Sequence, residues 1–248
     1  MNRWILKCGL AIVLVLPGAV GSSSGQELEP TVSPLIRIGQ PSGWSTELRL
    51  QRDSREFALG DEDLLDVQID HLVFRLGARI LPFLQGWAEA GTVRAEQTGR
   101  KGEAGFEWAI GGHVKVLEYV LAESPVLGTT QGLSLELNGS HRVASSEFPG
   151  ARLTWSDTRI IPAVAYTHNR LGEYRWHHAE PSGLVMRGGL VFNRTRGDYG
   201  DADLEENRDF GAMASVDLRW ESGWLTRLRG VFFGREEREL SISVGRHF

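Results

Sequence analysis

Apolar and polar residues alternate along most of the chain from Pro41 onward. The segment 210–220 illustrates the pattern, in which Phe210, Ala212, Ala214, Val216, Leu218 and Trp220 alternate with Gly211, Met213, Ser215, Asp217 and Arg219. A helix would place the charges of Asp217 and Arg219 beside its own apolar stripe, whereas successive residues of a strand point to opposite faces. The period of two therefore predicts β-strands.

The alternation predicts an all-β fold of about ten antiparallel strands, with eight as the alternative number. The expected ranges are 44–52, 66–80, 83–97, 104–119, 131–145, 152–168, 183–196, 209–221, 224–235 and 238–248. Most of these ranges exceed the five or six residues that are usual in globular sheets. In the second range Val67 and Ile69 are out of phase with Leu72, which predicts a β-bulge near His71.

The connectors between the predicted strands are of two kinds. Polar loops are expected over 52–63, 97–103 and 197–209, and shorter connectors over 80–82 and 222–223. Short turns at one end and longer loops at the other are typical of membrane β-barrels.

The first 25 residues have the layout of a secretory signal peptide. Two basic residues, Arg3 and Lys7, precede an apolar run that ends at Pro17, and small residues follow. We expect residues 26–40 to form a short periplasmic segment and residues 41–248 to form the barrel. The full chain carries a formal charge of −5, so removal of Arg3 and Lys7 leaves −7, and the only cysteine, Cys8, leaves with them.

Composition excludes several classes of protein. The 27 basic and 32 acidic residues give no positive excess, so we expect no nucleic-acid partner. A chain that is 24% charged, with no apolar run of about 20 residues, does not match a helical membrane protein. Two all-β interpretations remain: a secreted soluble barrel that binds a small apolar ligand, and a membrane barrel whose apolar face meets lipid.

The polar face of the predicted strands favours the membrane interpretation, because it carries charges of both signs in mid-strand. The candidates are Glu47, Arg49, Arg75, Arg79, Glu107, Lys115, Glu136, Arg187, Asp217, Arg219, Arg227 and Arg229. The chain has 24 Arg and only 3 Lys, and the planar guanidinium suits close pairing with carboxylates. We therefore expect a network of ion pairs across a narrow, largely filled lumen.

Aromatic residues gather near the predicted strand ends, as they do at the two interfaces of a membrane barrel. One group contains Trp44, Tyr119, Tyr166, Trp220, Trp224 and Phe248. The other contains Phe106, Trp108, Trp155, Phe192, Phe210 and Phe232.

The last strand, Glu239–Phe248, ends on phenylalanine with apolar residues at alternate positions before it. Together with the leader segment and the aromatic groups, it resembles the small bacterial outer-membrane β-barrel family, except that Arg246 stands where that family more often has an apolar residue. The resemblance implies a closed transmembrane β-barrel in the outer membrane. It also implies contacts with membrane lipids and lipopolysaccharide, and with the barrel assembly machinery through the strand that ends at Phe248.

The sequence offers no convincing catalytic constellation, and we predict no catalytic, cofactor-binding or metal-binding residues and no cofactor. The acids Asp201 and Asp203 are expected at the opposite end of the barrel from His177 and His178, unlike the site of surface proteases of this architecture. A barrel hydrolase acting at the membrane rim through His168 or His177 is the less favoured alternative. We expect a non-enzymatic protein that has a structural role in the envelope or forms a narrow channel.

Overall fold

The computed structural model describes residues 43–59, 63–97, 100–124, 128–148, 150–170, 181–206, 210–234 and 237–248, all within the compact unit Val32–Phe248. The signal peptide expected at 1–25 and the segment expected at 26–40 lie outside these residues. None of the described residues belongs to a helix long and apolar enough to cross a membrane.

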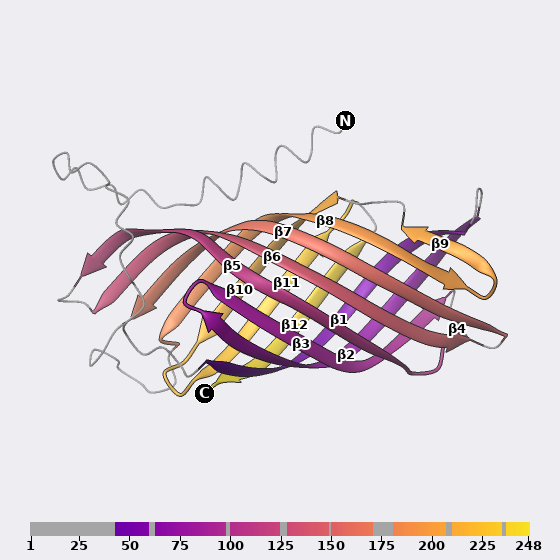
Figure 1. The fold of residues 1–248 in the computed structure, drawn as a ribbon, viewed down its shortest axis with the longest axis horizontal. Helices are drawn as coiled ribbons and strands as arrows, with labels where there is room; N and C mark the ends of the chain where they lie inside the picture. Colours follow the sequence, from indigo (N-terminus) through magenta and orange to yellow (C-terminus); the bar gives the residue numbers. More distant parts are fainter. Residues whose placement is uncertain are drawn as a thin grey trace. The chain divides into compact units, whose positions relative to one another are not determined.

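Ten long strands form a closed antiparallel barrel (Figure 1). They are β1 (Trp44–Leu59), β2 (Asp63–Leu81), β3 (Leu84–Gln97), β5 (Gly105–Ser124), β6 (Thr129–Phe148), β7 (Ala151–Arg170), β8 (Gly183–Tyr199), β10 (Phe210–Arg219), β11 (Trp224–Phe232) and β12 (Arg238–His247). Two short strands, β4 (Arg100–Lys101) and β9 (Ala202–Glu206), pair with them. The barrel closes through the β12–β1 and β8–β10 pairings, so the prediction of about ten strands is confirmed.

The outward face of the barrel is apolar around its middle. The exposed side chains of this face, here called the apolar belt, include Leu48, Leu50, Leu72, Phe74, Leu76, Ile110, Leu135, Leu137, Ile160, Val164, Met186, Leu190, Val216, Leu228, Leu240, Ile242 and Val244. A soluble barrel would turn such a face toward its interior. The sidedness is therefore that of a membrane barrel and not that of a soluble ligand-binding barrel.

Aromatic side chains flank the belt at both ends. Trp44, Tyr119, Trp224 and Phe248 are exposed at one end, and Phe106, Trp108, Phe192, Phe210 and Phe232 are exposed toward the other. Trp155 was predicted in the second group, and that prediction is wrong. Its side chain points into the barrel and is only 2% exposed.

The two ends of the barrel differ in construction. At the end here called the C-terminal end, the Phe248 amide donates to the Trp44 carbonyl at 3.0 Å, and the short β10–β11 turn contains Gly223 at φ 84°. A Cβ at Gly223 would lie 2.5 Å from the His247 carbonyl oxygen, so this turn requires glycine. Figure 1 shows β4 and β9 at the opposite end, here called the β9 end.

The strands extend further toward the β9 end than the polarity of the sequence predicts. The loop expected over 52–63 is wrong, because β1 continues to Leu59 and β2 begins at Asp63 in register with it. The loop expected over 197–209 is also partly wrong, because it contains the end of β8 and all of β9.

Strand β9 changes the number of strands in the ring. It pairs with β8 on one side and, through Phe57–Leu59, with β1 on the other. Strands β10, β11 and β12 reach less far and do not pair with it. The ring therefore contains ten strands around the belt and eight at the β9 end.

The bulge predicted near His71 is absent. Residues Val67–Arg79 of β2 pair without interruption with β3, and the register shifts only between Arg79 and Leu81. Val67 and Ile69 point inward because the interior at the β9 end is apolar, whereas Leu72 points outward into the belt. The apolar residues move from the inward to the outward face along a regular strand. This shift in the sequence pattern is the same as the one that a β-bulge would produce.

Candidate functional site

The candidate site is the interior of the barrel at the level of the belt, here called the lumen. It is lined by the inward-facing positions of the ten long strands, and many of these positions carry charges. Among the least exposed charged residues are Asp53, Arg55, His71, Glu89, Glu107, Glu136, Asp157, Asp217 and Glu239. The prediction that charges of both signs fill the lumen is confirmed.

A chain of ion pairs runs along the wall of the lumen on the side of the C-terminal end. It runs through Glu47, Arg227, Asp217, Arg187, Glu136 and His113, and so joins β1, β11, β10, β8, β6 and β5. Asp217, which is fully buried, accepts from Arg227 Nε at 2.8 Å and from Arg187 Nη1 at 2.7 Å. Glu136 then accepts from Arg187 Nε at 2.8 Å. Each guanidinium thus bridges two carboxylates, the arrangement that its planar fork favours.

A second group of charges surrounds Glu89 on β3. Arg49 Nη2 lies 2.6 Å and Arg75 Nε 2.9 Å from its carboxylate, and Arg142 Nη2 lies 3.6 Å away. The Arg75 guanidinium also stacks 4.0 Å from the ring centroid of Trp87, which points into the lumen. Three cations from three strands therefore converge on one carboxylate.

Closer to the β9 end, His71 lies between two carboxylates. Its Nδ1 is 2.8 Å from Glu107 Oε2 and its Nε2 is 3.2 Å from Asp53 Oδ2. A doubly protonated imidazole has donors for both partners. Arg55 adds a two-pronged contact with Asp157, with both nitrogen–oxygen distances at 2.8 Å.

Sequence reasoning missed this last group of charges. Asp53 and Arg55 fall in the range that was predicted as a loop, and His71 marked the predicted bulge. The signal that could have found them is the continued alternation of Gln51, Asp53, Arg55 and Phe57, which all point inward.

Two predicted lumen residues lie where the interior opens at the C-terminal end. Arg79 is exposed, and Lys115 is half-buried and pairs with Glu118 at 2.7 Å. They belong to the rim of the lumen and not to its filled centre.

The interior at the β9 end is apolar. This region, here called the apolar plug, consists of Phe57, Leu65, Val67, Ile69, Val93, Ala95, Ala144, Phe148, Leu153, Trp155 and Leu204, with Tyr199 packed against it. Eight strands enclose an interior that side chains can fill, and these side chains interlock as in a soluble core. The lumen is therefore closed by apolar packing at one end and crossed by ion pairs below it.

One ion pair marks the outer border of the belt. Arg52 Nε donates to Asp70 Oδ1 at 2.6 Å, and both side chains are more than half exposed. The hydrogen bond from Arg52 lowers the pKa of Asp70 below its usual value. This pair is the exposed counterpart of the buried pairs in the lumen.

The adjacent serines Ser145 and Ser146 on β6 do not lie beside His168, the histidine of the less favoured hydrolase alternative. Ser146 is buried, where its hydroxyl donates to the Glu103 carbonyl and accepts from the Ala95 amide. Ser145 lies opposite Thr154, whereas His168 follows about 14 residues further along β7, roughly 45 Å away at 3.3 Å per residue. His177 and His178 lie outside the described residues.

The acidic segment that contains Asp201 and Asp203 is partly strand. Asp201 and Asp203 are exposed at the β8–β9 hairpin, and Asp203 stands opposite Asp198. Within the described ranges, no group of three or more His, Cys, Asp and Glu side chains is arranged to hold a metal ion.

Comparison with known proteins shows similarity in fold but none in sequence family. No protein-family model matches the chain, and no curated protein matches it by sequence. Among solved structures, the outer membrane protease OmpT from Escherichia coli aligns at a TM-score of 0.42 and 9% identity, covering 87% of this chain and 100% of that one. An outer membrane channel from Pseudomonas putida F1 aligns at a TM-score of 0.39 and 11% identity, covering 88% of this chain and 100% of that one. The translocator domain of autotransporter NalP from Neisseria meningitidis aligns at a TM-score of 0.38 and 12% identity, covering 86% of this chain and 91% of that one.

Proposed function

We propose that this chain is a non-enzymatic outer-membrane barrel with a structural role in the envelope and a lumen closed to solutes. The outward apolar belt and its flanking aromatic side chains support insertion into a bilayer. The placement in the outer membrane also rests on the leader-like first segment and on the terminal strand that ends at Phe248.

The observation that carries the proposed closure is the double obstruction of the interior. The buried pair of Arg55 on β1 with Asp157 on β7 joins opposite sides of the ten-stranded ring, and the apolar plug fills the β9 end. An ion that entered from the C-terminal end would have to displace buried guanidinium–carboxylate pairs and then pass through packed apolar side chains. Both steps are unfavourable.

Conductance in a planar bilayer tests this closure. We expect the purified chain to insert without producing stepwise currents, while a wide porin in the same membrane conducts. Discrete, reproducible current steps from the purified chain would overturn the closed-lumen role. Detergent-dependent solubility and a heat-dependent shift in gel mobility test the membrane insertion separately, and a freely soluble chain would contradict it.

A narrow hydrated path is the second candidate. Several buried polar atoms of the lumen have no protein partner among the described residues, including Arg49 Nε, Arg142 Nη1, Glu107 Oε1 and Ser243 Oγ. Such atoms favour hydrogen bonds with water. Water permeability of proteoliposomes measured by light scattering distinguishes the two roles, because a hydrated path raises the permeability above that of protein-free vesicles even where ionic current is absent.

We also propose that β12 carries the contact with the assembly machinery. Its outward side chains Leu240, Ile242, Val244 and Phe248 are exposed along one face. Arg246, which departs from the family pattern, lies between the rings of Trp224 and Phe248, at 5.8 and 5.4 Å from their centroids. Its charge is thus accommodated at an aromatic rim.

A further inference from the structure

Arg194 and Arg196 are two arginines, two positions apart on one strand, that have no ion-pair partner among the described residues. Both side chains are exposed on the outward face of β8. In the part of the chain that the structure describes, neither guanidinium donates a hydrogen bond or forms an ion pair. Most lumen arginines, by contrast, contact at least one carboxylate.

The two arginines lie directly above the edge of the apolar belt. Phe192, two residues before Arg194 on the same face, is exposed and packs edge-on against Phe210 at 5.4 Å between ring centroids. Residues i and i+2 of a strand are about 7 Å apart, so Arg194 is one step beyond the last aromatic ring and Arg196 is two steps beyond it. This is the level at which the phosphates of a lipid leaflet lie outside its acyl chains.

Hydroxyl groups of β7 line the same surface. Thr158 lies opposite Arg194 and Ser156 lies opposite Arg196, so each arginine has a hydroxyl on the neighbouring strand. The Thr158 hydroxyl is in turn 2.9 Å from Nδ1 of His141 on β6. Directly opposed residues have Cβ atoms about 5 Å apart, and one anionic group can therefore contact both members of each pair.

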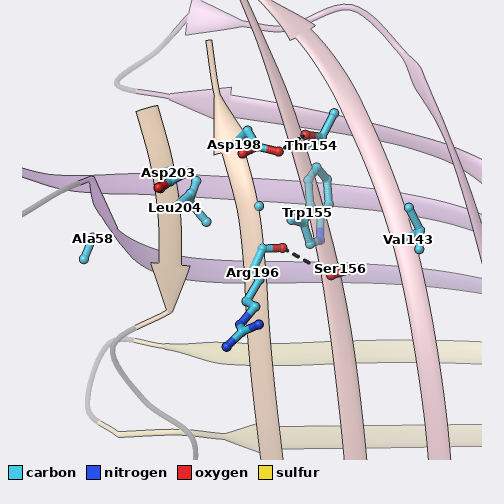
Figure 2. A pocket seen from close by; sticks show the side chains of 10 residues that line it. Ala58, Val143, Thr154, Trp155, Ser156, Arg196, Asp198, Asp203 and Leu204 are labelled. Atoms are coloured by element: carbon cyan, nitrogen blue, oxygen red, sulfur yellow. Dashed lines mark hydrogen bonds between the residues drawn. The ribbon is translucent and has the colours of Figure 1, made fainter. Parts of the chain in front are cut away.

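A hollow of about 710 Å³ adjoins this surface, with Thr154, Ser156, Arg196 and Asp198 among its lining residues (Figure 2). The Arg196 side chain extends away from Asp198 and Asp203 and along the direction in which β9 runs, back toward the belt. Asp198 and Asp203 stand nearer the tip of the hairpin and Glu205 stands opposite Arg196, whereas Arg194 lies one step nearer the belt. An anion that arrives from the membrane therefore meets Arg194 first.

We infer that Arg194, Arg196, Thr158 and Ser156 form a binding site for the phosphate group of a lipid in the leaflet at the β9 end, with Phe192 and Phe210 against its acyl chains. Arginine forks match phosphate oxygens in two-pronged contacts. The Thr158 hydroxyl can donate to a remaining oxygen, and the Ser156 hydroxyl can do so once it gives up its present hydrogen bond to the Arg196 carbonyl at 3.3 Å. The inference rests on the proposed insertion into a membrane and identifies one lipid contact of that membrane barrel.

Binding of diphosphorylated lipid A to the detergent-solubilised full chain tests the site, with native mass spectrometry as the measurement. We expect the R194A/R196A variant to bind at least about tenfold more weakly than the unaltered chain, because two charge-assisted contacts are lost. The R194K/R196K variant, which keeps the charges but loses the forks, should fall between the two. Heat-dependent gel mobility verifies that each variant is folded.

The R94A/R100A variant is the matched control. It also removes two exposed arginines that form no ion pair with the described residues near the β9 end, from β3 and β4 on another part of the ring. An equal loss of binding in both alanine variants would overturn the inference, since it would mean unspecific attraction to the whole rim. Unchanged binding by folded R194A/R196A and R194K/R196K would also overturn it.

Two further measurements distinguish failure of the proposed lipid site from failure of the proposed membrane insertion. Displacement of the lipid by millimolar inorganic phosphate would overturn the lipid as occupant, because the site would then take free phosphate from solution. An unaltered chain that stays soluble without detergent would overturn the membrane role itself. That outcome does not depend on any arginine variant.

Discussion

At the scale of single residues, the contribution of an ion pair to stability depends on whether the pair is buried in the lumen or exposed on the outer surface. Asp217 is fully buried and holds Arg187 and Arg227, whereas Asp70 holds Arg52 on the outer surface with both partners more than half exposed. Desolvation makes the loss of one buried partner costly, because the remaining charge has neither water nor a counterion. An exposed pair is screened and contributes little.

The D217A variant should therefore lose about 3–5 kcal/mol of unfolding free energy, as two partly buried guanidinium groups lose their shared, fully buried partner. The D70A variant, as the matched control, should lose less than about 1 kcal/mol. Urea unfolding in lipid vesicles, followed by tryptophan fluorescence, measures both. Equal losses in the two variants would show that the lumen pairs contribute no more than surface pairs.

At the scale of elements, the sequence predicts where strands cross the belt better than where they end. The positions 52–55 read Arg, Asp, Ser, Arg, and a polar tetrapeptide is typical of a loop. In the structure this is the point at which the outside changes from lipid to water and the inside changes from charged to apolar. Both faces are polar for a few residues, so the alternation of apolar and polar residues is interrupted in the sequence although β1 continues to Leu59.

The same limit applies to the lumen. Alternation and the excess of arginine predict a charged interior, but the pairs depend on register and on closure of the ring. Asp217 and Glu47 share Arg227 only because β12 pairs with both β11 and β1. No local pattern in the sequence contains that information.

The β9 hairpin gives a prediction at this scale. Leu204 is 1% exposed within the apolar plug, so the L204D variant would bury an unpaired carboxylate and detach β9. We expect limited proteolysis at the β8–β9 hairpin to be at least about tenfold faster than in the unaltered chain, since cleavage follows the population of the open hairpin. The A202D variant, which adds the same charge at an exposed position of β9, should be cleaved at the unaltered rate. Equal cleavage of the two variants would contradict a packed hairpin.

At the scale of the whole molecule, the belt determines which solvent the barrel requires. Leu48 lies on the outward face midway between Trp44, at the aromatic edge, and Arg52, at the polar edge. It therefore marks the middle of the apolar span on β1. A charge there meets the most apolar surroundings that a bilayer offers.

The L48R variant should accordingly lose about 2–4 kcal/mol of stability in lipid vesicles, and the Q68R variant, outward but beyond Asp70, about 0–1 kcal/mol. Folding into vesicles, followed by the heat-dependent gel shift over a urea series, measures the difference. Stability of L48R equal to that of Q68R would mean that this face does not meet lipid.

The change from ten strands to eight has a mechanical consequence. The ring around the belt closes between β1 and β12 through ten residue pairs, whereas the ring at the β9 end closes between β1 and β9 through three. A force that separates neighbouring strands breaks their backbone hydrogen bonds one after another. The β1–β9 pairing, which has three residue pairs, therefore breaks before the β1–β12 pairing. The ring at the β9 end can then open along the β1–β9 pairing while the ten-stranded ring around the belt stays closed.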